Sequence, residues 1–447
     1  MLENLFALGD RVVARAKPGE QIEAIVVNET DTEVRVFEGD VESFTSATSQ
    51  GIGIRVINDQ RQGFAWAGSL DEDVIDSTLT EARDNATFGS IDPDLDLAEP
   101  DGVPMVELDL YDDSVSNFAT DDKIALALEL EAITKDRDPR VLLVESVDFA
   151  DSVGAAVVVT TKGIRVGGRD SGSYVTATVI AGGDEDTQVG FGYSVHRNPG
   201  ELDLEHASQM AVERSTRLLG AVKPKTERLT VVLDPMVTAQ FLGIIGSTMS
   251  GEAVLKGRSL FADRLGDNVA SAMITLVDDP TNPKAFTATD ADGEGLATRR
   301  NVLIDNGKLN KFVHNSYTGR RLSTASTGSA VRGYSSTPGV GTMALSLVPG
   351  ERAQADIIAS IDNGVLIQGV SGLHSGVNPV SGDFSTGADG LRIRDGELAE
   401  PLREFTIGST LQRMLTDVIE VGGDIEWLPS SAAGLSLAVG DITLSGA

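Results

Sequence analysis

Residues 229–251, LTVVLDPMVTAQFLGIIGSTMSG, join a short apolar run to a longer apolar segment at a proline. The residues before Asp234 have the β-branched and apolar composition of a buried strand. Pro235 suits the first turn of a helix, where a backbone N–H has no partner within the helix. We therefore predict a strand over 229–235 and a helix over 237–251, which together open a domain.

Downstream of residue 270 the chain is rich in Gly and Thr, and its apolar runs are short. This pattern favours an antiparallel sheet or a partial barrel with flanking helices. We expect residues 227–447 to form one β-rich C-terminal domain.

Upstream, the segment VKPKTE at 222–227 predicts a domain boundary. Before it we expect two small α/β sandwich units, 1–105 and 106–226, separated by a loop rich in Pro, Gly and Asp at 88–113. The fold class is therefore α+β. The predicted elements of the first unit are a helix at 2–16, strands at 23–28, 33–40 and 51–58, and a helix at 70–86. Those of the second are a helix from an N-cap at Thr120 to about Asp136, strands at 141–151, 154–163 and 173–183, and a helix at 203–219.

The charge of the chain excludes several classes of partner. Its 36 Lys and Arg against 68 Asp and Glu give a net charge of −32. A protein that binds nucleic acid through phosphates needs a basic face, and so does one that binds an anionic membrane. We expect neither partner. No apolar run is long enough to span a bilayer, and the first residues do not resemble a signal peptide, so we expect a cytoplasmic protein.

The residues for several kinds of catalysis are missing. The chain has no Cys, which excludes disulfides, thiol nucleophiles and Cys-based zinc sites. Its four histidines form neither HExxH nor HxxxH, and we expect His196, in a polar loop, and His206, on a helix, at the surface. GxSxG is absent. The run TDADGEG (289–295) is not a calcium loop, because its first and twelfth positions would be Ala288 and Arg299.

Two segments remain as candidate sites. Residues 298–322 hold six Arg and Lys and one acid, Asp305. They fit a strand–turn–strand with solvated charges, or a contact for an acidic partner surface or a substrate carboxylate. Residues 369–390, GVSGLHSGVNPVSGDFSTGADG, fit either tight turns between strands or a backbone that binds an extended peptide. His374 beside Ser375 lacks an orienting acid, so we do not interpret the two as a nucleophile pair.

Three stretches together resemble one family. Residues 369–425 are similar to the C-terminal signature of the TldD/PmbA family, 290–309 to its acidic-Gly, Thr, Arg segment, and 229–243 to the strand and helix that begin its C-terminal domain. The resemblance implies a peptidase that acts on unfolded or extended peptides, described earlier as a modulator of DNA gyrase. TldD-type subunits of the family carry HExxxH on that helix, and a downstream Cys completes a zinc site. PmbA/TldE-type subunits lack these ligands and pair with a TldD-type subunit.

The zinc positions of this chain determine the subunit type that the resemblance favours. The first His, the Glu and the second His correspond to Gly243, Ile244 and Thr248. None of these residues binds zinc or activates water, and no Cys is available. The resemblance therefore implies a PmbA/TldE-type subunit that has no cofactor of its own and pairs with a zinc-binding TldD-type partner in a heterodimer.

Three hypotheses follow for the function. In the first, the chain is a non-catalytic subunit that helps to hold an extended peptide. In the second, it is a stand-alone homodimeric peptide-binding or regulatory protein. In the third, it is an enzyme that uses Asp, Ser or Arg. The first predicts peptide contacts at these positions: Gly376, Asn378, Gly382, Asp383 and Ser385, with Arg299 and Arg300 at the rim.

Overall fold

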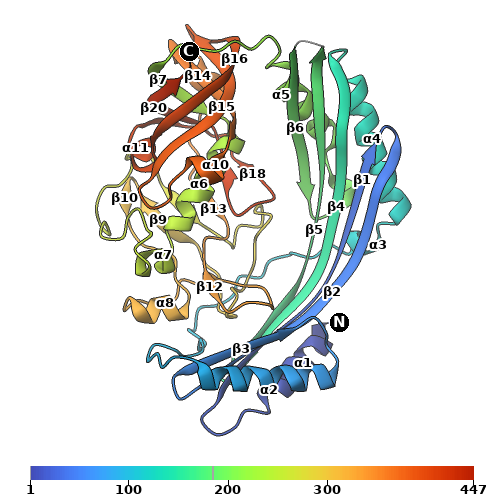
Figure 1. Cartoon of the computed structure of the whole chain (residues 1–447), viewed down its shortest axis with the longest axis vertical. Helices are drawn as coiled ribbons and strands as arrows, with labels where there is room; N and C mark the ends of the chain where they lie inside the picture. Colours follow the sequence, from blue (N-terminus) through green and yellow to red (C-terminus); the bar gives the residue numbers. More distant parts are fainter. Residues whose placement is uncertain (1, 184–185, 447) are drawn as a thin grey trace.

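The N-terminal half of the chain is built on one six-stranded antiparallel sheet, in the order β3-β2-β1-β4-β5-β6 (Figure 1). The computed structural model describes residues 2–183 and 186–446. Both predicted N-terminal units contribute strands to this sheet, because β1 pairs with β4 from Glu23↔Thr160 to Val36↔Val147. The elements of this half are α1 (Leu2–Val13), β1 (Gln21–Phe37), β2 (Asp40–Asn58), β3 (Arg61–Ala67), α2 (Glu72–Phe88), α3 (Asp113–Asn117), α4 (Thr120–Asp136), β4 (Val141–Thr160), β5 (Arg165–Gly183), β6 (Asp186–His196), the 3₁₀ turn η1 (Pro199–Glu201) and α5 (Leu204–Thr216).

Two turns predicted inside this sheet are wrong. The polar run 28–32 lies within β1 and does not separate two strands, and β4 continues through 152–153. Thr30 is paired on both sides, with Thr48 of β2 and Val153 of β4. Ladders on both edges satisfy the backbone of these polar residues, so the strand continues where the local composition favours a turn.

Two smaller predictions also need correction. Helix α4 begins at Thr120 itself, so its N-cap is Ala119, one residue earlier than predicted, and no side chain caps the helix. His196 is the last residue of β6 and not part of a loop, although it is exposed as expected. His206 is exposed near the start of α5, as predicted.

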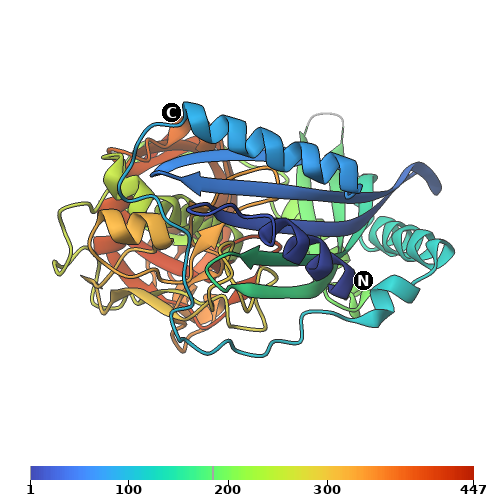
Figure 2. The same ribbon diagram turned by 90° about the horizontal axis from the view of Figure 1, so that it is seen from below.

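Helices cover one face of the sheet in two groups, at its two ends (Figures 1 and 2). Helices α1 and α2 bury Leu5 and Leu79 against β1, β2 and β4. Helices α4 and α5 bury Leu130 and Ala211 against the other end, where Phe149 is fully buried. The opposite, concave face of the sheet is turned toward the C-terminal domain (Figure 1). Within the described residues no helix is both long and apolar enough to cross a membrane.

The C-terminal domain is β-rich, which confirms the predicted α+β class. Strands β16, β15, β14, β7 and β20 are hydrogen-bonded in that order, and pairing between β16 and β20 closes them into a barrel. The β7–β14 pair is parallel. The elements of this domain are β7 (Glu227–Leu233), α6 (Pro235–Thr248), α7 (Gly251–Leu255), β8 (Leu276–Asp278), β9 (Asn301–Asp305), β10 (Lys308–Leu309), α8 (Ser316–Arg321), β11 (Ala330–Val331), β12 (Gly339–Val340), β13 (Leu345–Leu347), α9 (Gln354–Ile358), β14 (Asn363–Ser371), α10 (Leu373–Gly376), β15 (Asp383–Arg394), β16 (Glu397–Thr410), α11 (Leu411–Thr416), β17 (Val418–Val421), β18 (Glu426–Trp427), β19 (Ala433–Gly434) and β20 (Leu437–Ser445).

The acidic linker 89–112, which has no helix or strand, is bound by the basic segment 298–322. Arg320 donates from Nε to the carbonyl of Asp94 at 2.8 Å and from Nη2 to that of Asp96 at 2.7 Å. Arg299 forms an ion pair with Asp101 at 2.7 Å. Part of the basic segment therefore contacts an acidic surface within the same chain. The rest of the basic segment includes a strand–turn–strand, as predicted. Asn306 and Gly307, both with positive φ, form the turn that joins β9 to β10.

A buried carboxyl in the C-terminal domain makes stability depend on pH. Asp278 Oδ1 accepts the N–H groups of Met343 and Ala344 at 2.8 and 2.7 Å, while Oδ2 is buried without a partner. Burial raises the pKa of Asp278 to about 6. Because the pKa of Asp278 is higher in the folded than in the unfolded protein, the protonated carboxyl contributes its full stabilisation below about pH 4. It is lost as the pH rises through 6, and the loss amounts to about 3 kcal/mol.

We expect Asp278→Asn to remove this dependence. Asparagine keeps the acceptor for both N–H groups and does not ionise. Urea unfolding of both proteins at pH 4 and pH 7.5 measures the effect: the variant should be more stable than the wild type at pH 7.5, and the difference should be smallest at pH 4. Parallel pH profiles for the two proteins would contradict the assignment.

Candidate functional site

The concave face of the sheet and helix α6 enclose an apolar cavity of about 550 Å³. Its sheet side carries aromatic residues of β5 and β6, and its other side carries one face of α6 and the segment 428–432. The residues that line it are Tyr174, Thr176, Phe191, Tyr193, Met236, Ala239, Gln240, Gly243, Leu428, Pro429, Ser430, Ser431 and Ala432.

Two more cavities continue from this one. The second, of about 440 Å³, shares Gly243 and Ser431 with the first and is bordered by Pro379 and Val380. The third, of about 490 Å³, shares Glu252 and Lys256 with the second. We call the first two, which meet at Gly243, the cleft. The three cavities thus lead from an apolar end, lined by aromatic residues of the sheet, to a charged end lined by Arg55 and Glu294.

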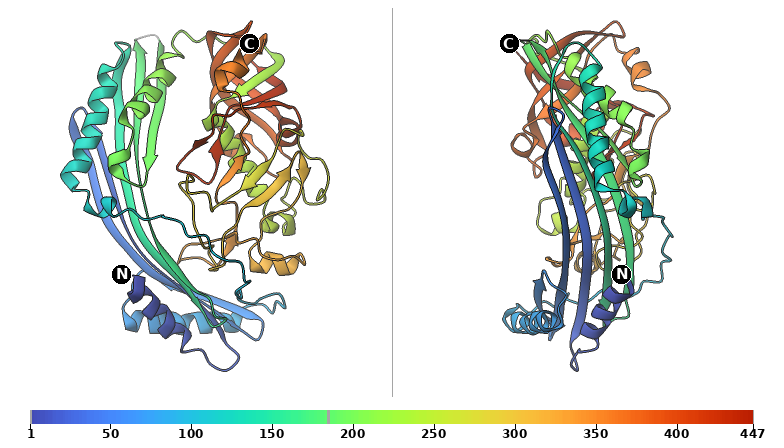
Figure 3. Two further views of the ribbon diagram at one scale, coloured as in Figure 1. Left: turned by 180° about the vertical axis from the view of Figure 1, so that it is seen from behind. Right: turned by 90° about the vertical axis from the view of Figure 1, so that its right-hand side faces the viewer.

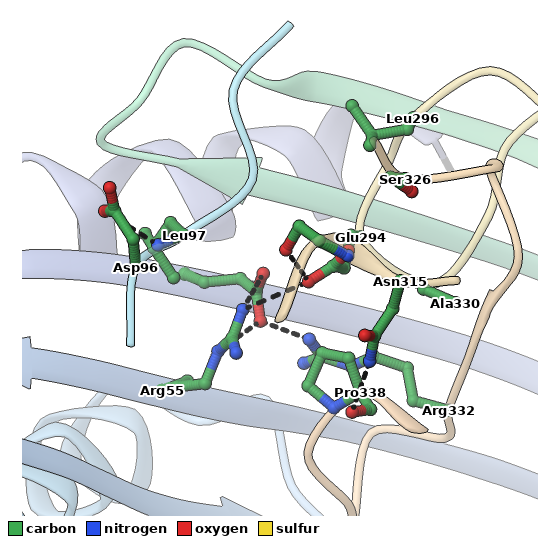
Figure 4. A network of polar contacts seen from close by, with 12 residues as sticks. Arg55, Asp96, Leu97, Glu294, Leu296, Asn315, Ser326, Ala330, Arg332 and Pro338 are labelled. Atoms are coloured by element: carbon green, nitrogen blue, oxygen red, sulfur yellow. Dashed lines mark hydrogen bonds and ion pairs between the residues drawn. The ribbon is translucent and has the colours of Figure 1, made fainter. Parts of the chain in front are cut away.

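The charged end contains a buried ionic network (Figure 4). Arg55 of β2 donates to Glu23 of β1 from Nε at 3.1 Å and from Nη2 at 2.9 Å. Arg332, from the C-terminal domain, forms an ion pair with the same carboxylate. Glu294 accepts from the backbone and the hydroxyl of Ser316 at 2.8 and 2.5 Å. The network joins the sheet to the C-terminal domain.

The packing of α6 determines which of its residues border the cleft. Asp234 caps the helix by accepting from Met236 N at 3.2 Å, and Pro235 lies in the first turn, as predicted. Phe241 and Ile245 are buried in the barrel core, and the ring centroid of Phe241 lies 5.1 Å from that of Phe384. A Cβ added at Gly243 would have no atom within 4 Å. The cleft is therefore open at Gly243.

The three positions that the family resemblance assigns to the zinc motif offer no metal ligand. Gly243 has no side chain, and Ile244 packs its hydrocarbon against the core. Thr248 is 2 % exposed, and its hydroxyl donates to the carbonyl of Ile245 at 2.7 Å. Among residues 2–183 and 186–446, no group of three or more His, Cys, Asp or Glu could hold a metal ion.

The glycine-rich segment forms a tight turn at the edge of the cleft. Asn378 Oδ1 accepts from the N–H groups of Val380 and Ser381 at 2.9 and 3.2 Å. Asp383 accepts from the hydroxyl of Ser381 at 2.7 Å, and Gly382 has a φ of +85°. The polar groups of Asn378 and Asp383 thus shape the turn itself, which places Pro379 and Val380 at the second cavity.

The other candidate residues lie around this turn or apart from it. Gly376 ends α10, where a Cβ would come within 2.5 Å of the carbonyl oxygen of Ser385 on β15. Arg299 and Arg300 do not line the cleft, and their carboxylate partners are Asp101 at 2.7 Å and Asp279 at 3.8 Å. The structure therefore brings the 378–383 turn and α6 together and places the two arginines elsewhere.

His374 and Ser375 are both exposed on α10. The hydroxyl of Ser375 donates to the carbonyl of Gly372 at 3.2 Å. This bond holds the hydroxyl against its own backbone.

The aromatic wall of the first cavity was not predicted from the sequence. Tyr193 is 7 % exposed, and its hydroxyl lies 3.4 Å from Glu426 Oε2. Burial raises the pKa of both Tyr193 and Glu426, so the tyrosine stays neutral. A signal was present in β6, where glycines alternate with aromatic residues. A Cβ at Gly190 or Gly192 would lie 2.0 Å from a carbonyl of α5, so the glycines face that helix and the aromatic residues face the cleft.

Comparison with known proteins covers nearly the whole chain. Residues 22–86 match domain 1 of PmbA/TldA metallopeptidases, 113–219 match their central domain, and 226–446 match their C-terminal domain. The chain belongs to the PmbA/TldD family of metallopeptidases. This confirms the resemblance seen in the sequence.

Relatives within the PmbA/TldD family agree over most of their length. Metalloprotease PmbA of Escherichia coli O157:H7 is 25% identical over 410 residues, which is 90% of this chain and 88% of that protein. A candidate modulator of DNA gyrase from Thermotoga maritima has a TM-score of 0.91 at 25% identity, covering 98% of this chain and 99% of its own. TldE from Thermococcus kodakarensis shares the fold, with a TM-score of 0.90 at 24% identity and 99% of both chains covered.

Proposed function

We propose that this chain is a non-catalytic, TldE/PmbA-like subunit of a TldD-type zinc metallopeptidase, in which it binds an unfolded or extended peptide. The observation that carries the proposal is the lack of a side chain at position 243, which is glycine. At the point where the family resemblance implies a zinc ligand, the cleft has no side chain, and Ile244 and Thr248 offer no ligand either. The zinc and the water that it activates belong, in this proposal, to a TldD-type partner.

The free edge of the sheet supports binding of an extended peptide. In the described residues β6 is an edge strand that pairs only with β5, and it carries Phe191 and Tyr193 beside the first cavity. A peptide that adds to β6 would form main-chain hydrogen bonds, which do not depend on its sequence. Its alternate side chains would point to the concave side, where the cavity suits one large apolar group.

A second candidate function is a stand-alone peptide-binding protein. It is favoured by one observation: the sheet and helix α6, which belong to one chain, both contribute residues to the apolar cavity. Under this alternative the chain binds peptide without cleaving it.

One experiment separates these functions. The chain is purified alone and together with an HExxxH-bearing family member from the same genome, and cleavage of an unfolded peptide is measured with and without a chelator. We expect a zinc-free chain with no activity alone, and cleavage by the mixture that the chelator abolishes. The same peptide carrying a fluorescent label measures binding to the chain alone by anisotropy.

Each other outcome has a clear meaning. Binding without cleavage in the mixture favours the stand-alone protein. Cleavage by this chain alone overturns both proposals.

A further inference from the structure

A partly buried carboxylate borders the apolar cavity of the cleft. Glu426 of β18 accepts a hydrogen bond of 3.4 Å from the hydroxyl of Tyr193, which lines this cavity. Burial and the charge of Asp234 raise the pKa of Glu426. Arg214 and His206 oppose this effect, but Arg214 is already paired with Asp234 at 2.6 Å. The fold therefore compensates the charge of Glu426 only in part, and a cation in the cavity would complete the compensation.

The sheet side of the cavity offers aromatic faces beside this carboxylate. The rings of Phe191 and Tyr193 stack with their centroids 6.2 Å apart, and Tyr174 of the neighbouring strand β5 also lines the cavity. Aromatic faces attract ammonium and guanidinium groups, and the hydrocarbon stems of Lys and Arg pack against apolar surface. The wall therefore suits a side chain that has an aliphatic stem and a cationic end.

The concave face of the sheet, which faces the C-terminal domain (Figure 3), carries further negative charge. Glu29, Asp31 and Glu33 alternate along β1. Val34 of the same strand packs under α4 and α5, so the three carboxylates lie on the opposite, concave face. Burial raises the pKa of Tyr174, and the charge of Glu33 raises it further, so this acidic row reaches the cavity wall. A face of one sign attracts ligands of the other sign.

We propose that the apolar cavity binds a basic side chain of the peptide, an arginine or a lysine. The aliphatic stem lies against the rings of Phe191 and Tyr193, and the cation lies beside Glu426. Arginine binds more tightly than lysine, because its planar guanidinium stacks on aromatic faces and meets a carboxylate with two parallel N–H groups. This inference rests on the proposed function and deepens it, since it names the class of peptide that the cleft selects.

The test compares four labelled, unfolded peptides that differ at one central position, which holds arginine, lysine, norleucine or glutamate. The rest of each peptide is uncharged and both ends are blocked. Binding to the chain alone is measured by anisotropy at pH 7.5 and about 0.3 M salt, where the Debye length is shorter than 8 Å and general attraction to an acidic protein is weakened. We expect the arginine and lysine peptides to bind roughly tenfold more tightly than the norleucine peptide, and the glutamate peptide to bind most weakly.

Two variants with the same net charge locate the cation. Glu426→Gln keeps the shape and an acceptor for the hydroxyl of Tyr193 but removes the charge, so the preference for arginine over norleucine should fall to about threefold or less. Its thermal midpoint should not fall, because burial already disfavours the ionised carboxyl. Glu397→Gln is the matched control. Glu397 is exposed and pairs with Arg394, at the far end of the β15–β16 ladder from Asp383, so this variant should keep the wild-type preference.

The outcomes separate this inference from the proposed function. Equal binding of all four peptides overturns the inference and leaves the proposed function in place. A preference for arginine that Glu426→Gln and Glu397→Gln retain equally also overturns it, because the cation then lies away from Glu426. Binding of none of the four peptides contradicts the proposed function itself.

Discussion

Replacing Glu23 with glutamine should lower the free energy of unfolding by about 3–5 kcal/mol, the cost of leaving a buried ion without its partner. Glu23 is fully buried between Arg55, whose side chain is 5% exposed, and Arg332, whose side chain is fully buried. Arg332 Nε and Nη2 have no hydrogen-bond partner in the structure. Removal of the carboxylate therefore leaves two guanidinium groups close together and poorly compensated in the interior.

The effect should depend on pH with a defined sign. Burial alone would raise the pKa of Glu23, but Arg332 and Arg55 hold it below the usual value. Its contribution is therefore present at neutral pH and lost as the pH falls through the folded pKa. Urea denaturation at pH 7.5 measures the difference, which should shrink under acid conditions.

An exposed ion pair provides the control. Arg394 and Glu400 form a pair whose side chains are 57% and 38% exposed. Glu400→Gln should change stability by less than about 1 kcal/mol, because solvent screens such pairs. Equal effects of Glu23→Gln and Glu400→Gln would show that the buried network does not hold the sheet to the C-terminal domain.

The second large effect is expected at Gly243. Phenylalanine at this position would project into the space where the two cavities of the cleft meet, since nothing lies within 4 Å of an added Cβ. We expect Gly243→Phe to weaken binding of the labelled unfolded peptide at least tenfold and to slow cleavage by the mixed assembly by a similar factor. The thermal midpoint of unfolding should not fall, because the position is open.

Gly243→Ala is the matched variant. Alanine favours the interior of α6 by about 1 kcal/mol over glycine and adds a single methyl group. It should therefore raise stability slightly and leave peptide binding near the wild-type level. Undiminished binding by the phenylalanine variant would show that the peptide does not pass Gly243.

The elements of this fold that could be predicted are those with a local signal. Pro235 and the apolar segment after it predicted helix α6 at the cleft. The strand–turn–strand reading of residues 298–322 predicted the turn that joins β9 and β10. The β1 segment at 28–32 could not be predicted, because its polar residues are held by ladders to β2 and to β4, more than a hundred positions away.

The site, too, contains parts that a local sequence signal predicts and parts that depend on distant contacts. The positions assigned to the zinc motif on α6 rest on the family resemblance, with Pro235 marking the start of the helix. The alternation of glycine and aromatic residues in β6 indicates which face carries Phe191, but the cavity beside it forms only where the sheet packs against α6 of the other domain. Arg299 suggested a binding rim from charge alone, whereas its contact with Asp101 depends on the path of a distant linker.

The pairing of β1 with β4 has a consequence for biosynthesis. A ribosome that adds roughly 5–20 residues per second needs on the order of ten seconds to proceed from β1 to the end of β4. Throughout that interval the nascent β1–β2 hairpin exposes the edge of β1 that later pairs with β4, because Thr160, the partner of Glu23, has not yet been synthesised. We therefore expect slow codons in residues 60–160 to lower the yield of native protein.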